Sequence, residues 1–412
     1  MFEKFGISER LCALDEELMA ACAPAFLRAE QIRDYNQIKV LEAFTRNRVG
    51  AQHFAGSTGY GYGDVGRDAL DRDFADAFGA EDALCRAQFM SGTHALTVAL
   101  FGILRAGDTL LAATGEPYDT LQSVISGDGV GSLREFGVRY EQVELLNGQP
   151  DYKEIERRAP GAKLVHIQRS RGYSGRDAFS CDVIEKTVAA AKRGNPNAVV
   201  MVDNCYGEFT ETTEPTQHGA DLIVGSLIKN AGGAVAETGG YIAGRADCVE
   251  LCAHRLTAPG TGREIGCWPQ GLRTLYLGLY MAPAITCEAV KSGIYAAALF
   301  QKLGFPTFPD KDAPRSDIVT TVELGSPDNL KKVCAAIQGA SPVDSYAVPE
   351  PWAMPGYTDE VIMAAGAFTN GSSIELSCDG PLRAPYRLYL QGGISLTASR
   401  YAYLKAAALL TE

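Results

Sequence analysis

The chain has 412 residues, of which 46% are hydrophobic, and this is enough for one large domain together with a smaller one. Its formal net charge of −12 disfavours a protein that binds nucleic acids or anionic membranes. The N-terminus has no long uncharged apolar run like that of a signal peptide, and no later run reaches membrane-spanning length. A cytoplasmic protein is therefore expected.

The 11 cysteines are scattered, and none of them forms a CxxC motif. This pattern predicts reduced thiols that pack as small core residues, without disulfide bonds or a zinc site. Packing is favoured over catalysis for Cys205 as well. His94 and His166 are interpreted as packing or polar supporting groups, and no metal site is expected.

The first third of the chain begins with a polar, amphipathic pattern over residues 1–50 that predicts helix. We therefore expect an N-terminal helical segment over residues 1–55. Glycines and tyrosines then cluster in "GSTGYGYGDVGRD" (56–68), which predicts a structured loop. The stretch "ALDRDFADAFG" (69–79) again has a helical pattern.

Strand-like and helix-like segments alternate from about residue 80 to residue 245. Three short apolar runs bounded by polar residues predict strands, and one longer stretch has apolar residues at helical spacing. These segments are "KLVHIQ" (163–168), "AVVMVD" (198–203) and "DLIVGS" (221–226) for strands, and "CDVIEKTVAAAKRGN" (181–195) for the helix. The alternation predicts an α/β domain over residues 56–285, with a mainly parallel sheet covered on both faces.

Proline-rich stretches appear beyond residue 285. Strand-like runs such as "SDIVTTVEL" (316–324) and "SSIELS" (372–377) alternate there with helical patterns such as "NLKKVCAAIQG" (329–339). A smaller α+β domain is therefore expected over residues 286–412.

Lys229 follows a predicted strand, and the seven residues on either side of it contain no other Lys or Arg. A buried lysine is costly as a cation, and a Schiff base with a carbonyl cofactor is one way to remove its charge. For a lone lysine, a surface position with the charge in water is the better interpretation. Residues at the ends of other predicted strands favour a bound cofactor for Lys229, because ligands bind beyond the carboxyl ends of parallel strands.

Asp203 and Tyr118 lie at two such strand ends. Asp203, 26 residues before Lys229, could hold a pyridine nitrogen protonated, as pyridoxal phosphate requires, or could only cap a turn. Tyr118, in "GEPYDTL" (115–121), could stack on an aromatic cofactor or belong to the core or the surface.

A phosphate site is the third feature. Ser91, Gly92 and Thr93 lie where a helix is expected to begin, which suits a phosphate as well as an ordinary helix cap. Ser226 could add its hydroxyl to the same phosphate. Together, these features suggest a fold-type I enzyme that depends on pyridoxal phosphate.

The order of motifs resembles the methionine gamma-lyase family, often called aluminium-resistance proteins, over nearly the whole chain. These proteins are relatives of the cystathionine lyases and synthases of Cys/Met metabolism. The motifs are "SGTHA", "GEPYDTL", "VDNCYGEF", "GSLIKN" and "GGYIAG". The resemblance implies a fold-type I, aspartate-aminotransferase-like architecture, pyridoxal 5'-phosphate as cofactor and Lys229 as its Schiff-base residue. It also implies a homo-oligomer, dimer or tetramer, with shared active sites. The residues that match the family pattern are Lys229, Asp203, Tyr118, Ser226, Gly92 and Thr93.

Two parts of the site depart from the wider superfamily. There, a Tyr-x-Arg segment of the neighbouring subunit reaches the phosphate; here Tyr60, Tyr62 and Arg67 are the candidates, at a different spacing. The arginine that binds the substrate carboxylate is replaced by Glu375 in this chain. Another planar guanidinium must then take its place. Our candidates are Arg383 first, followed by Arg387, Arg169 and Arg171.

The activity that the resemblance implies is a carbon–sulfur lyase acting on a sulfur-containing amino acid. Elimination of the cystathionine beta-lyase or methionine gamma-lyase type would give an oxo-acid, ammonia and a thiol. Lys229 would remove the Cα proton as general base, with Asp203 and Tyr118 beside it. Two alternatives stay open: an aminotransferase with the same fold and lysine, and a cofactor-binding stress or metal-tolerance protein with little catalysis.

Overall fold

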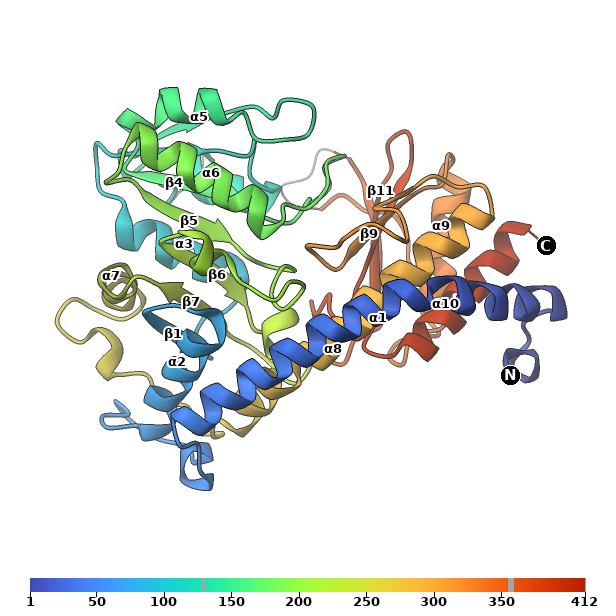
Figure 1. The fold of residues 1–412 in the computed structure, drawn as a ribbon, viewed down its shortest axis with the longest axis horizontal. Coiled ribbons are helices and arrows are strands. Elements are labelled where there is room, and N and C mark those ends of the chain that lie inside the picture. Colours follow the sequence, from blue (N-terminus) through green and yellow to red (C-terminus); the bar gives the residue numbers. More distant parts are fainter. Residues whose placement is uncertain (128–129, 355–358, 412) are drawn as a thin grey trace. The chain divides into compact units, whose positions relative to one another are not determined.

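The computed structural model describes residues 1–127, 130–354 and 359–411 (Figure 1). The chain forms two compact units: residues 35–282, here called the large unit, and residues 1–34 with 283–412, the small unit. Two long helices, α1 (Glu9–Arg46) and α8 (Arg273–Lys302), each contribute residues to both units. The domain limits predicted at residues 55 and 285 stay predictions.

The large unit is built on a seven-stranded sheet in the order β1-β7-β6-β5-β4-β2-β3 (Figure 1). Strand β7 runs antiparallel to both of its neighbours, and the other pairs are parallel. The strands are β1 (Asp82–Arg86), β2 (Thr109–Ala112), β3 (Arg139–Gln142), β4 (Leu164–Gln168), β5 (Val199–Asp203), β6 (Leu222–Ser226) and β7 (Gly240–Gly244). The predicted strands over 163–168, 198–203 and 221–226 are therefore confirmed.

Both faces of this sheet are buried, which explains why its central strands are continuous apolar runs. In β5, Val200 and Val202 pack into one hydrophobic core, whereas Val199 and Met201 pack into the other. The first core contains residues of α2 (Val65–Phe78), α5 (Tyr152–Arg158) and α6 (Cys181–Gly194). The second contains residues of α3 (Gly92–Ile103), α4 (Asp119–Ile125) and α7 (Ala246–Leu256). The fold-type I architecture predicted for the chain is confirmed.

The small unit contains a five-stranded antiparallel sheet in the order β10-β11-β12-β9-β8. Helix α9 packs against β10, β11 and helix α10. The elements are β8 (Thr307–Phe308), β9 (Val319–Glu323), α9 (Pro327–Gln338), β10 (Val361–Ala365), β11 (Ser377–Pro381), β12 (Arg387–Gln391) and α10 (Leu396–Thr411). This is the α+β organisation expected for the C-terminal part.

One strand prediction in the small unit is wrong. The strand expected over 372–377 begins only at Ser377. Glu375 is buried, and its carboxylate accepts the backbone N–H groups of Phe368 at 2.9 Å and Thr369 at 3.1 Å. Because these bonds fold the chain back on itself, the residues before Ser377 form bends although their apolar pattern is that of a strand.

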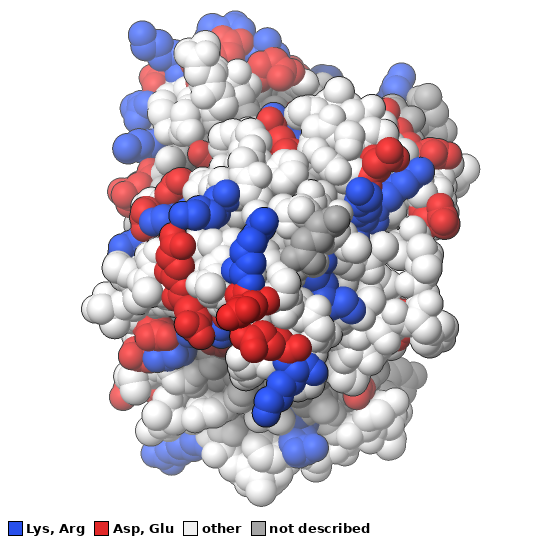
Figure 2. All heavy atoms as spheres, turned by 90° about the vertical axis from the view of Figure 1, so that its right-hand side faces the viewer, with Lys and Arg blue, Asp and Glu red and all other residues white. Residues whose placement is uncertain are grey.

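Figure 2 shows acidic and basic side chains interspersed over the face that it presents. Among the described helices, none combines the length and the apolar character needed to cross a bilayer.

Candidate active site

Asp203 is the last residue of β5, and its side chain is only 5% exposed. Its Oδ1 atom accepts the backbone N–H of Cys205 at 3.2 Å. Burial raises the pKa of Asp203 to about 6, although this hydrogen bond acts in the opposite direction. A cationic partner above the carboxyl group would stabilise the ionised form.

Lys229 is half-buried and immediately precedes the short 3-10 helix η5 (Asn230–Gly232). Its Nζ atom lies 5.4 Å from the centre of the Tyr206 ring, within the range of a cation–π contact. The Asn230 side chain donates to the backbone carbonyls of Tyr206 at 2.9 Å and Glu208 at 3.1 Å. These bonds tie the lysine segment to the turn that follows Asp203.

Cys205 connects the two charged groups electrostatically. Burial raises the pKa of its thiol well above the usual range, the Asp203 carboxylate adds to this effect, and Lys229 opposes it. Asp203, Cys205 and Lys229 are therefore neighbours, as the positions of Asp203 and Lys229 after parallel strands predict.

The N-terminus of α3 lies against the end of β6. A Cβ atom placed on Gly92 would be 3.1 Å from Cβ of Ser226, so this close approach favours glycine. Ser91 caps the helix by accepting the backbone N–H of His94 at 3.0 Å. Ser226 is 1% exposed, and its hydroxyl bonds no described protein group. A buried, unbonded hydroxyl beside a helix N-terminus suits a phosphate group.

Tyr118 joins this group from the start of α4. Its hydroxyl lies 3.1 Å from Oγ1 of Thr93, and its backbone N–H donates to Oε1 of Gln168 at 2.8 Å. Burial raises the pKa of Tyr118 well above the usual range, and the charge of Asp203 adds to the effect. The ring is thus held between the helix N-terminus and Asp203. Sequence reasoning missed Gln168, whose position at the end of β4 was the available signal.

We call these residues the strand-end cluster: Ser91, Gly92, Thr93, Tyr118, Asp203, Ser226 and Lys229. They fit pyridoxal phosphate because they combine an amine, a buried carboxyl group, an aromatic ring and a helix N-terminus with an unbonded hydroxyl. The individual roles assigned to them stay predictions.

The loop before α2 presents its tyrosines to solvent, whereas Arg67 lies in the first turn of α2, so the loop predicted over 56–68 ends at Asp64. Tyr60 and Tyr62 are 68% and 65% exposed, and their rings stack with centres 5.4 Å apart. Arg67 is buried, and it donates to the carbonyl of Gly61 at 2.9 Å and to the carboxylate of Asp68 at 3.0 Å. These contacts favour a structural role for Arg67, while the two tyrosines stay candidates for a neighbour's site.

Arg169 belongs to a buried polar network on the large unit. Its guanidinium donates to Asn204 at 2.7 Å and to Glu211 at 2.7 Å, and it lies 3.4 Å from Glu214. Asn204 also bonds Tyr241, whose hydroxyl donates to Glu208 at 2.8 Å. We call the six residues the Arg169 network: Arg169, Asn204, Glu208, Glu211, Glu214 and Tyr241. Sequence reasoning missed it, because its members come from separate segments.

The other arginine candidates also have carboxylate partners. Arg171 is 2% exposed and pairs with Asp177 at 3.2 Å. In the small unit, Arg387 pairs with Glu323 at 2.8 Å, and Arg383 pairs with Asp359 at 3.1 Å. Burial thus favours structural roles for Arg169 and Arg171, and the substrate role of Arg383 stays a prediction.

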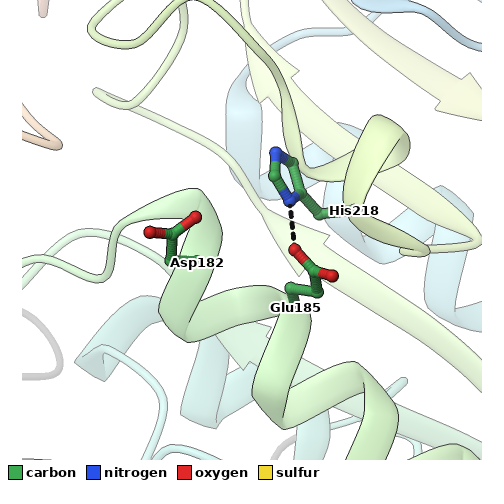
Figure 3. Close-up of side chains that lie close together, drawn as sticks. All are labelled: Asp182, Glu185 and His218. Atoms are coloured by element: carbon green, nitrogen blue, oxygen red, sulfur yellow. Dashed lines mark hydrogen bonds and ion pairs between the residues drawn. The ribbon is translucent and has the colours of Figure 1, made fainter.

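One group of described residues could hold a metal ion: Asp182, Glu185 and His218 (Figure 3), whose ligand atoms lie within 4.8 Å of one another. However, protein groups already bond both nitrogens of His218, with Glu185 at 2.8 Å and Thr213 at 2.9 Å. The two carboxylates are exposed, and Asp182 lies in the first turn of α6, where the helix dipole favours an anion. We therefore assign no metal centre.

Comparison with known proteins agrees with this geometry. Uncharacterised protein YnbB of Bacillus subtilis (strain 168) is 44% identical over 98% of each chain. A carbon-sulfur lyase involved in aluminum resistance from Clostridium novyi NT is 45% identical, with a TM-score of 0.95 over 100% of this chain and 98% of that one. The pyridoxal-5'-phosphate dependent protein YhfS from Escherichia coli shares the fold at 17% identity, with a TM-score of 0.63 over 93% and 97% of the two chains. Since the model of the methionine gamma-lyase family also matches residues 11–410, this chain is a member of that family.

Proposed function

We propose that this protein is a pyridoxal-phosphate-dependent carbon–sulfur lyase that acts on a sulfur-containing amino acid. The observation that carries the proposal is the strand-end cluster, in which Lys229, Asp203 and the unbonded Ser226 hydroxyl lie together in a chain of this family. Pyridoxal phosphate, when bound, supplies an electron sink for negative charge at the substrate Cα.

The residues that would hold the cofactor follow from the contacts of the cluster. The helix N-terminus at Gly92 and Thr93, with the Ser226 hydroxyl, would bind the phosphate. The Asp203 carboxylate would accept a hydrogen bond from the protonated ring nitrogen, and this cationic contact would offset the burial that raises its pKa to about 6. Tyr118, anchored by Gln168 and Thr93, would stack on the ring.

Lys229 would have two tasks in this enzyme. It would hold the cofactor covalently at rest, and after the substrate amine replaces it, its own amine would accept the proton from Cα. A thiol would then leave from Cβ, or from Cγ after a second proton is removed at Cβ. Water would then hydrolyse the released unsaturated amino acid, so that the final products would be an oxo-acid, ammonia and the thiol.

We also propose a homo-oligomer in which a second copy of the chain completes the site. The exposed, stacked pair Tyr60 and Tyr62 supports this, because large aromatic side chains at 68% and 65% exposure are suited to an interface. Mixing a Lys229 variant with a Tyr60/Tyr62 variant, each inactive alone, should restore partial activity. Full activity of a diluted monomer would contradict the proposal.

Product analysis tests the reaction itself. Purified protein loaded with pyridoxal phosphate would be incubated with methionine, cystathionine, cysteine and homocysteine, with and without an added oxo-acid. An oxo-acid, ammonia and a thiol in equal amounts are expected. Transfer of the amino group to the added oxo-acid would identify an aminotransferase instead, and absence of turnover with every substrate would favour a non-catalytic binder.

A further inference from the structure

His166 is an unusual core residue. It lies in the middle of β4, it is 1% exposed, and neither ring nitrogen bonds a described protein group. Burial lowers its pKa to about 4, so the imidazole is neutral and carries one N–H donor. A buried polar group without a partner destabilises the folded state, so a core position with no other task would favour an apolar side chain.

The strand register places His166 next to the strand-end cluster. Residue pairs His166–Met201 and Gln168–Asp203 face each other across β4 and β5. Since side chains alternate along a strand, His166 and Asp203 lie on the same face of the sheet, as diagonal neighbours. Diagonal Cα atoms are about 7–8 Å apart, a span that a ring side chain and one water molecule can bridge.

The neighbour of His166 on the side away from β5 is small. On its other side, His166 is paired with Ala112 of β2, whose side chain is a single methyl group. Asp203, for its part, is 5% exposed, and the donors that lower its pKa, the backbone N–H and the thiol of Cys205, do not offset the effect of burial. An ionised carboxylate this deeply buried is stabilised by each additional donor.

We propose that His166 is a positioning residue for Asp203, whose carboxylate it holds ionised and oriented by donating an imidazole N–H through one bridging water molecule. The inference rests on the proposed function and deepens it, because Asp203 is the group expected to face the cofactor ring nitrogen. It also explains why a polar ring is kept in an otherwise apolar layer with Leu164 and Met201.

Three variants test this proposal. His166→Phe keeps a flat ring of similar size and removes both nitrogens, whereas His166→Gln keeps an N–H donor at similar reach. Met201→Leu is the matched control, because it changes an apolar neighbour of the same layer and no hydrogen bond. The measurements are the unfolding temperature of the cofactor-free protein, the dissociation constant of pyridoxal phosphate and the ¹⁵N signal of a labelled cofactor ring.

His166→Phe should leave the unfolding temperature unchanged or raise it, weaken cofactor binding roughly tenfold or more, and shift the ring-nitrogen signal toward the unprotonated position. His166→Gln should recover most of the binding, and Met201→Leu should change neither the binding nor the signal. A change in unfolding temperature alone, with wild-type affinity and ring-nitrogen signal, would show a purely structural histidine and overturn the inference.

A measurement without cofactor separates this inference from the proposed function. In cofactor-free wild-type protein, the imidazole N–H of His166 should give a slowly exchanging proton signal, and Asp203→Asn should move it, because the acceptor loses its charge. An unmoved signal overturns the inference even if the cofactor binds. Failure of wild-type protein to bind pyridoxal phosphate, with a signal that does move, would instead refute the proposed function alone.

Discussion

The strand-end cluster and the Arg169 network are both polar parts of the large unit with buried groups, but they differ in how their hydrogen bonds are satisfied. In the network, both Nη atoms of Arg169 bond protein groups, and Glu214 accepts from Asn204 at 3.0 Å and from the Phe209 backbone at 2.9 Å. Only Nε of Arg169 and one oxygen of Glu208 bond no described protein group there. In the cluster, the Ser226 hydroxyl bonds no described protein group and lies beside a helix N-terminus. A group bonded within the chain stabilises the fold, whereas an unbonded hydroxyl beside a helix N-terminus is available to an anionic ligand.

Lys229→Ala should give the largest effect, because it removes the amine from the cluster. We expect no covalent cofactor and no turnover, with the fold retained. Borohydride reduction of wild-type protein followed by peptide mapping should place the label on Lys229, and Lys163→Ala serves as control at an exposed lysine. A label on any other lysine would refute the assignment.

Arg169→Met should damage stability rather than ligand binding. Removing the cation leaves Glu211 and the fully buried Glu214 without their partner, and breaking a buried pair in this way costs about 3–5 kcal/mol. Urea unfolding measures the loss. Arg171→Met is the control and should cost less, because its partner Asp177 is 68% exposed. A stable Arg169→Met protein that no longer binds the amino acid would restore Arg169 as a substrate ligand.

Glu208 gives the network a pH dependence whose sign can be worked out. Burial raises the pKa of Glu208 to about 8, from about 4.5 in the unfolded chain. The folded state therefore binds more protons between these values, and stability falls as the pH rises from about 4.5 to 8. Glu208→Gln stays neutral and should remove this loss, stabilising the protein by roughly 4 kcal/mol at pH 8 and by roughly 1 kcal/mol at pH 5. Equal stability of both proteins at both pH values would contradict a raised pKa.

Much of the fold and of the strand-end cluster could be predicted, because both depend on local patterns. Apolar runs bounded by polar residues marked β4, β5 and β6, and the rule for strand ends placed Asp203 beside Lys229. What could not be predicted depends on contacts between distant residues. The structural role of Arg169 depends on its hydrogen bonds to Asn204 and Glu211, which lie far from it in the sequence. The strand wrongly predicted over 372–377 is replaced by bends because Glu375 bonds the backbone of residues 368 and 369.

Arg383 combines a property of the Arg169 network with one of the strand-end cluster. Its guanidinium bonds a protein group, and yet it is accessible to a ligand. Its side chain is 53% exposed. Its ion-pair partner is Asp359, and not Asp379, which is closer in sequence and could have fixed the arginine within its own loop. An exposed ion pair contributes little to stability, so this guanidinium can exchange its partner for a substrate carboxylate. Arg387 pairs with Glu323 with 32% exposure and is the matched control.

Arg383→Lys keeps the charge but loses the planar fork, so we expect amino-acid binding to weaken by roughly 1–3 kcal/mol. The absorbance of bound cofactor should stay unchanged, since its ring and phosphate are expected at the strand-end cluster. Amino-acid titrations followed by cofactor absorbance measure the affinity in Arg383→Lys, Arg387→Lys and wild-type protein. Asp359→Asn sharpens the comparison: if Asp359 competes with the substrate, this variant should bind the amino acid at least as tightly as wild type. If amino-acid binding weakens in Arg387→Lys and not in Arg383→Lys, the carboxylate site must be assigned to Arg387, although this arginine is the less exposed of the two.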